Sequence, residues 1–184
     1  MPSTESSTLQ LAFRYKNGVI GIKGSRENAV LAAGYFSEAA VEGCGIASFH
    51  LGKAYLKGEG VQKDETEAAR WLKRAAEQGV KEAQYKFAMM LSAGSGIEQN
   101  KVECTKWLTY ASAQGHVRSS AYLAAMTWRG DGTCKDPELA VKYFKLAARK
   151  GDAESQFVMV CVFPFERRIY YQQTHHLMIL NYRI

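Results

Sequence analysis

The sequence predicts an all-α protein, a solenoid of antiparallel helix pairs, and three observations lead to this prediction. The 184-residue chain matches itself when it is shifted by 36 positions. Each period contains two stripes of small or apolar residues at helical spacing. The chain also has 16 glycines, and most of them fall between these stripes, where glycine ends a helix. One helix pair has too small a core to be stable alone, whereas stacked pairs bury a continuous core.

The first helix of each period is predicted from a stripe that ends at a Gly-x-Gly element. Glycine adopts the left-handed conformation without a side-chain clash, so this element should stop the helix. The three copies are Leu51-Gly52-x-x-Tyr55-x-x-Gly58-x-Gly60, Phe87-Ala88-x-x-Leu91-x-x-Gly94-x-Gly96 and Leu123-Ala124-x-x-Thr127-x-x-Gly130-x-Gly132.

The second helix of each period is predicted from a capping residue that precedes its own stripe. Asp64 is expected to cap the helix and Glu67 to complete a capping box. Asn100 and Glu103 repeat the box, and Asp136 is followed by a proline at the first helical position. The stripes are Ala68, Trp71-Leu72 and Ala75-Ala76, then Trp107-Leu108 and Ala111-Ser112, then Tyr143-Phe144 and Ala147-Ala148, and they end at Gly79, Gly115 and Gly151.

The period extends beyond these three copies in both directions. Leu11 to Gly18 fit the first-helix pattern if the following loop is four residues longer, and Ala32 to Gly43 fit the second-helix pattern. The predicted organisation is a disordered segment 1–8, repeats 9–44, 45–80, 81–116 and 117–152, the first helix 153–163 of a truncated repeat, and a non-repeat tail 164–184.

The tail 164–184 breaks the repeat pattern. Pro164 intrudes, Glu166 stands where a glycine is expected, and neither the Asp cap nor the Ala-Ala pair follows. Three interpretations stay open: the tail packs on the last helix as an improvised cap, it is poorly ordered, or the chain is part of a longer array.

Residues 47–79 resemble the Sel-1-like repeat family, which is related to the tetratricopeptide repeat. The family pattern is approximately A-x-x-x-L-G-x-x-Y-x-x-G-x-G-V-x-x-D-x-x-x-A-x-x-W-[YL]-x-x-A-A-x-x-G, and the resemblance covers about residues 9–163. It implies a right-handed α/α superhelix like that of tetratricopeptide proteins. It also implies a non-catalytic adaptor or scaffold, because the family has no shared catalytic residues.

Composition and charge limit the other classes of protein. With 47% apolar and 23% charged residues the composition is that of an ordinary globular chain. The net charge of +6 is spread along the sequence without a polybasic tract. Residues 1–8 lack the charge and apolar pattern of a signal peptide, and no apolar run is long enough to span a bilayer. A cytoplasmic protein with no membrane insertion is expected, and its oligomeric state is left open.

The sequence shows no pattern typical of catalysis, cofactor binding or metal binding. Gly94-Ser95-Gly96 aligns with the Gly-x-Gly elements of the other repeats, so it is interpreted as a turn. His50 and His116 are isolated, and the four cysteines form no CxxC pair. We therefore expect no catalytic, cofactor or metal residues.

A binding surface is expected on the first helices, which usually line the concave face of helical solenoids. With Leu51 and Tyr55 placed inward, the outward positions of the three copies form a basic face with aromatic and thioether groups. Such a face suits a peptide or extended segment of another protein, an acidic one in particular. Its residues are His50, Lys53, Lys57, Tyr85, Lys86, Met89, Tyr122 and Arg129.

Two alternative functions belong to other classes. A cysteine-rich secreted bacterial branch of the family is associated with weak β-lactam binding or hydrolysis, and it has a cysteine pair at fixed positions in each repeat. Here Cys44, Cys104, Cys134 and Cys161 fall at four different repeat positions, and four free thiols would exclude the bridged form. The second alternative is nucleic-acid binding through the basic face, which would show a steep salt dependence.

Overall fold

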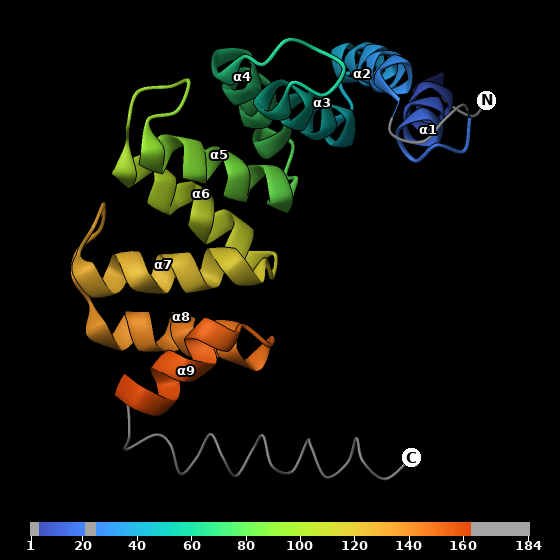
Figure 1. The fold of residues 1–184 in the computed structure, drawn as a ribbon. Helices are drawn as coiled ribbons and strands as arrows, with labels where there is room; N and C mark the ends of the chain where they lie inside the picture. Colours follow the sequence, from blue (N-terminus) through green and yellow to red (C-terminus); the bar gives the residue numbers. More distant parts are fainter. Residues whose placement is uncertain (1–3, 21–24, 163–184) are drawn as a thin grey trace, which may run out of the picture. The chain divides into compact units, whose positions relative to one another are not determined.

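The computed structural model describes residues 4–20 and 25–162, and every regular element within them is an α-helix (Figure 1). The all-α prediction is therefore confirmed for this part of the chain, and the tail 164–184 lies outside it. The helices are α1 Thr4–Lys16, α2 Arg26–Val41, α3 Gly45–Lys57, α4 Glu65–Glu77, α5 Lys81–Ala93, α6 Lys101–Ala113, α7 Val117–Arg129, α8 Pro137–Arg149 and α9 Ala153–Val162.

The helices belong to two compact units, residues 1–116 and 117–184. In the first unit each helix from α1 to α6 packs on the next one along the chain. In the second unit α7 packs on α8, and α8 packs on α9. Short loops between packed neighbours make each pair antiparallel, as the period of 36 predicts.

Small residues dominate the core between the first two repeats. Ala12 of α1, Ala39 and Ala40 of α2, and Ala47 of α3 are fully buried together with Phe36. Their small side chains let three helices approach closely, and the large side chains Phe36 and Leu51 fill the remaining space. In the second unit the core contains Ala124, Phe144, Ala148 and Met159.

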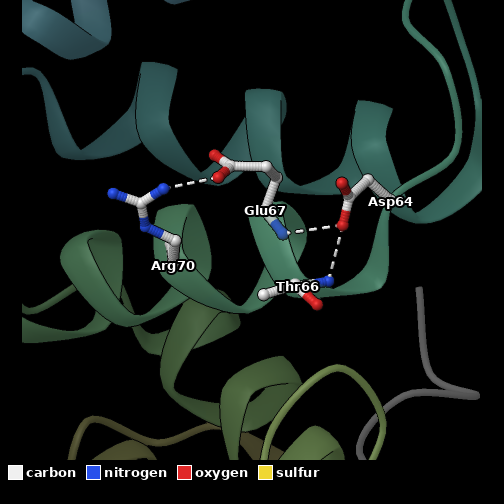
Figure 2. A network of polar contacts seen from close by, with 4 residues as sticks. All are labelled: Asp64, Thr66, Glu67 and Arg70. Atoms are coloured by element: carbon white, nitrogen blue, oxygen red, sulfur yellow. Dashed lines mark hydrogen bonds and ion pairs between the residues drawn. The ribbon is translucent and has the colours of Figure 1, made fainter.

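The second helices of repeats 2, 3 and 4 are capped by the predicted residues, but the predicted capping box is wrong. Asp64 Oδ1 accepts from the backbone N–H groups of Thr66 and Glu67 at 2.9 and 3.0 Å (Figure 2). The backbone N–H of Asp64 is already donated to the carbonyl of Tyr55, 3.0 Å away, so Glu67 does not bond to it. The Glu67 carboxylate instead pairs with Arg70 at 2.5 Å.

The same arrangement returns in the next two repeats. Asn100 and Asp136 each accept from the backbone N–H of the third residue of their helix, Glu103 and Leu139, at 2.9 Å. Their own N–H groups are donated to the carbonyls of Leu91 and Thr127. The carbonyl comes from the same repeat position each time, so one hydrogen bond closes the loop between the two helices in all three repeats.

The two glycines of each Gly-x-Gly element have different roles. Gly58 ends α3 in the left-handed conformation, with φ of 72°, and Gly94 ends α5 in the same way. Gly60 and Gly96 also have positive φ, but their α-carbons lie against the first turn of the second helix of the preceding repeat. A Cβ at Gly60 would overlap the carbonyl oxygen of Ala29, and one at Gly96 would overlap that of Glu65. The second glycine is therefore a contact between repeats as well as a turn residue.

Repeat 1 differs from the others at both of its helices. Helix α1 begins at Thr4, so residues 4–8 are helical where the sequence predicted disorder. Helix α2 begins at Arg26, three residues before the position that corresponds to the start of α4, because Ser25 caps it by accepting from the N–H of Asn28 at 3.1 Å. Part of the predicted longer loop is thus an additional helical turn.

Candidate functional site

The predicted face is divided between the two units, and each part is described by itself. Lys57 and Arg129 are exposed, and the other six residues are half-buried. In the first unit, α3 carries His50, Lys53 and Lys57, and α5 carries Tyr85, Lys86 and Met89. In the second unit, α7 carries Tyr122 and Arg129.

The three predicted residues of α3 line a cavity of about 440 Å³ that is also lined by α1 and α2. Helix α2 contributes small or apolar side chains, including Ala29, Ala32, Ala33 and Phe36. The charged residues of the wall are Lys16, Lys53, Lys57 and Glu59. The cavity is therefore mostly apolar along α2, with Asn28 as its polar residue there, and it carries three ammonium groups and one carboxylate.

Sequence reasoning missed Lys16, the charged residue that α1 contributes to the wall of this cavity. In the repeat register Lys16 corresponds to Leu56, so the outward positions chosen on α3 do not include it. The divergence of repeat 1, with its longer loop, was the only signal that this end of the array differs from the other repeats.

The imidazole of His50 belongs to no group of metal ligands among the described residues, and α1 and α2 pack around it. The ring stacks on Phe36 at 4.9 Å between centroids and meets Phe13 edge-on at the same distance. Lys16 Nζ lies 2.6 Å from His50 Nδ1. Nδ1 must accept this hydrogen bond, so the neutral ring carries its proton on Nε2.

Burial is the main cause that lowers the pKa of His50 to about 4, and the charges of Lys16 and Lys53 add to it. The pKa of Lys16 is lowered as well, first by burial and then by the charge of Lys53. The Glu59 carboxylate acts in the opposite direction on Lys16. The cluster therefore consists of a neutral histidine surrounded by ammonium groups that repel one another.

We expect the imidazole of His50 to titrate near pH 4 and the substitution Lys16→Met to raise its pKa. Because the folded-state pKa lies below the ordinary value of 6.5, the unfolded chain binds the extra proton, and stability falls as the pH drops from about 6.5 to about 4. An NMR titration of the imidazole Cε1–H resonance measures the pKa directly. Lys73→Met, on the exposed face of α4, is the control; a midpoint near 6.5 in the unchanged protein would contradict the assignment.

The predicted residues of α5 do not line this cavity, and Tyr85 has its own aromatic contact. The Tyr85 ring packs on His116 with centroids 4.7 Å apart. The preceding residue, Gln84, donates to the carbonyl of Ala76 at 3.2 Å and accepts from Gln114 at 2.9 Å. These buried contacts hold the start of α5 against the ends of α4 and α6.

Within residues 4–20 and 25–162, no three or more His, Cys, Asp or Glu side chains group as metal ligands would. Cys44, Cys104 and Cys134 are free thiols, and the side chain of Cys161 lies outside the described residues. None of the described helices is long and apolar enough to cross a membrane.

Comparison with known proteins identifies the repeat. A family model described as the Sel1 repeat matches residues 6–43, 45–80, 81–116 and 117–152. No curated protein sequence matches the chain.

Among solved structures, a Sel1 repeat protein from Oxalobacter formigenes is 31% identical with a TM-score of 0.78, and the match covers 86% of this chain and 64% of that one. A protective antigen of uropathogenic Escherichia coli with an SLR fold is 30% identical with a TM-score of 0.75, over 82% of this chain and 32% of that one. The chain thus spans less than two thirds of either relative.

The cysteine rich protein B of Helicobacter pylori has a TM-score of 0.57 at 15% identity, over 73% of this chain and 98% of that one. This likeness shows the fold alone. With the two closer structures it confirms that the chain folds as a helical repeat solenoid of this type.

Proposed function

Because the chain belongs to the Sel1 repeat family, we propose that it is a non-catalytic scaffold that binds a segment of another protein. The observation that supports this function is the run of four repeats over residues 6–152, in a family whose members generally mediate protein–protein interactions and are generally of the non-catalytic scaffold type.

The proposed binding residues lie on the first helices of the repeats. Lysines beside aromatic and thioether groups suit an extended acidic peptide, because the ammonium groups attract carboxylates while the apolar surfaces hold the intervening side chains. On α3 these residues are His50, Lys53 and Lys57, on α5 they are Tyr85, Lys86 and Met89, and α7 provides Tyr122 and Arg129.

Charge reversal on the first helices tests this function. The variant Lys53→Glu, Lys86→Glu, Arg129→Glu should lose proteins that the unchanged chain captures from a cell extract, and mass spectrometry identifies them. The matched control is Arg70→Glu, Lys106→Glu, Lys142→Glu. It makes the same change in net charge, at exposed residues that occupy the same repeat position on three second helices.

Each protein lost is then purified and titrated against both variants. Direct binding that weakens at least tenfold with the first variant and not with the control supports the proposal. Equal binding by all three forms would rule out the first-helix face.

A further inference from the structure

We propose that the cavity between α1, α2 and α3 binds a carboxylate group joined to a small apolar group, held between Lys16 and Lys53. The inference rests on the proposed function, since it names the part of the partner segment that this end of the array would take. It follows from the charges, the shape and the position of the cavity.

The charges of the cavity wall are unbalanced. Glu59 is the only acidic residue of the wall, and it pairs with Lys57 at 3.0 Å. Among the residues that the structure describes, neither Lys16 nor Lys53 lies within ion-pair distance of a carboxylate. Their ammonium groups lie instead over the rings of Phe36 and Phe49, at 5.6 and 5.4 Å from the centroids.

This arrangement makes an anion favourable in the cavity. Burial lowers the pKa of Lys16 most, and the like charge of Lys53 lowers it further, so the two ammonium groups repel each other at a partly buried site. A carboxylate placed between them would replace repulsion with two charge-assisted hydrogen bonds. The neutral ring of His50 accepts a hydrogen bond from Lys16 but carries no negative charge, so it does not balance the charges of the two lysines.

The side chains of α2 determine which chemical group can bind beside the carboxylate. Ala29, Ala32 and Ala33 have short side chains, and they leave the cavity of about 440 Å³ open beside the Phe36 ring. That volume lies in the lower part of the range for small-molecule pockets, so it has room for a carboxylate together with an adjoining side chain. The ligand is therefore a carboxylate next to a compact apolar group, as at a peptide C-terminus or at an acidic residue beside an aliphatic one.

The cavity also coincides with the divergence of repeat 1. Ser25 and Asn28, which belong to the cap and additional first turn of α2, line it together with Ala29. In repeats 2 and 3 the second helix begins later in the register, at Glu65 and Lys101. The additional residues at the start of α2, which the other repeats lack, thus form part of the cavity wall.

Four small probes test the inference by NMR titration of the full chain. N-acetyl-leucine presents a terminal carboxylate beside an apolar group, and N-acetyl-aspartic acid α-amide presents a side-chain carboxylate. N-acetyl-leucinamide has the leucine shape without the charge, and inorganic phosphate has charge without the apolar group. Saturable shifts at residues of α1, α2 and α3 with one or both carboxylates are expected, and which of the two binds identifies the source of the carboxylate.

Substitutions at the lysines complete the test. Lys16→Met and Lys53→Met should each weaken carboxylate binding at least tenfold, whereas Lys73→Met, on the exposed face of α4, should not. Binding should also raise the pKa of His50, because the anion offsets the two lysine charges. Circular dichroism confirms that each variant is folded.

Three results would overturn the inference: no binding of either carboxylate, equal binding of N-acetyl-leucinamide or phosphate, and binding that persists in both lysine variants. None of them depends on a partner protein. The proposed scaffold function would therefore fail separately, through the capture experiment on the first-helix face.

Discussion

We expect the replacement of Gly60 with alanine to lower the free energy of unfolding by about 3 kcal/mol, and the replacement of Gly58 with alanine to lower it by about 1 kcal/mol. The two glycines are matched in backbone conformation, with φ of 76° and 72°. The left-handed strain of an alanine is therefore about equal at both positions. The expected difference comes from the contact that only Gly60 makes with the preceding repeat.

The physical reason is the nature of the atoms that a Cβ would meet. At Gly58 the nearest atom is Lys63 Cβ at 3.5 Å, which is ordinary van der Waals contact. At Gly60 the Cβ would overlap the carbonyl of Ala29 in the first turn of α2, and a backbone carbonyl cannot rotate away as a side chain can. The alanine therefore has to separate the loop from α2 and open the junction between repeats 1 and 2.

The next repeat provides an independent copy of the same comparison. Gly96→Ala should cost about as much as Gly60→Ala, because its Cβ would overlap the carbonyl of Glu65, and Gly94→Ala should cost about 1 kcal/mol. Urea unfolding followed by circular dichroism at 222 nm measures all four variants. If both glycines of a pair lost the same free energy of unfolding, the junction between the repeats would have adjusted to the added Cβ. The contact with the preceding repeat would then not require glycine at the second position.

The sequence predicts contacts within a repeat better than contacts between repeats. The caps Asp64 and Asn100 were predicted because capping depends on residues three apart along the chain. The contact of Gly60 with Ala29 joins residues that are 31 positions apart, and nothing in the local pattern distinguishes Gly60 from Gly58. The sequence analysis interpreted both glycines as helix terminators. That role is sufficient for Gly58, whereas Gly60 also contacts the preceding repeat.

The candidate site was predicted in part for the same reason. The helical periodicity places His50, Lys53 and Lys57 along α3, and all three line the cavity. Lys16 lies 34 residues before His50, on a helix that follows the repeat pattern only approximately, and its ammonium group was not predicted to meet the imidazole. The period describes what the repeats share, whereas the cavity depends on how repeat 1 differs.

We expect the replacement of Phe87 with alanine to lower the free energy of unfolding by about 3 to 5 kcal/mol, the usual cost of removing a fully buried aromatic ring. Phe87 lies on α5 with none of its surface exposed, and its ring meets Trp107 of α6 edge-on at 5.7 Å. The alanine would leave a cavity between these two helices that the fixed pairing of α5 and α6 cannot close. Phe87→Leu should cost only about 1 kcal/mol, because leucine holds the same position at Leu51 and Leu123.

Tyr110 supplies the matched control, because its ring also meets Trp107 edge-on, at 5.8 Å, while 57% of the residue's surface is exposed. Tyr110→Ala removes an aromatic contact without creating a buried cavity, so it should cost at most about 1.5 kcal/mol. Urea unfolding followed by circular dichroism and tryptophan fluorescence compares the three variants. If Phe87→Ala and Tyr110→Ala cost the same, the aromatic contact with Trp107 rather than burial would determine the stability of this repeat. A much larger loss for Phe87→Ala means that the buried volume between α5 and α6 does so.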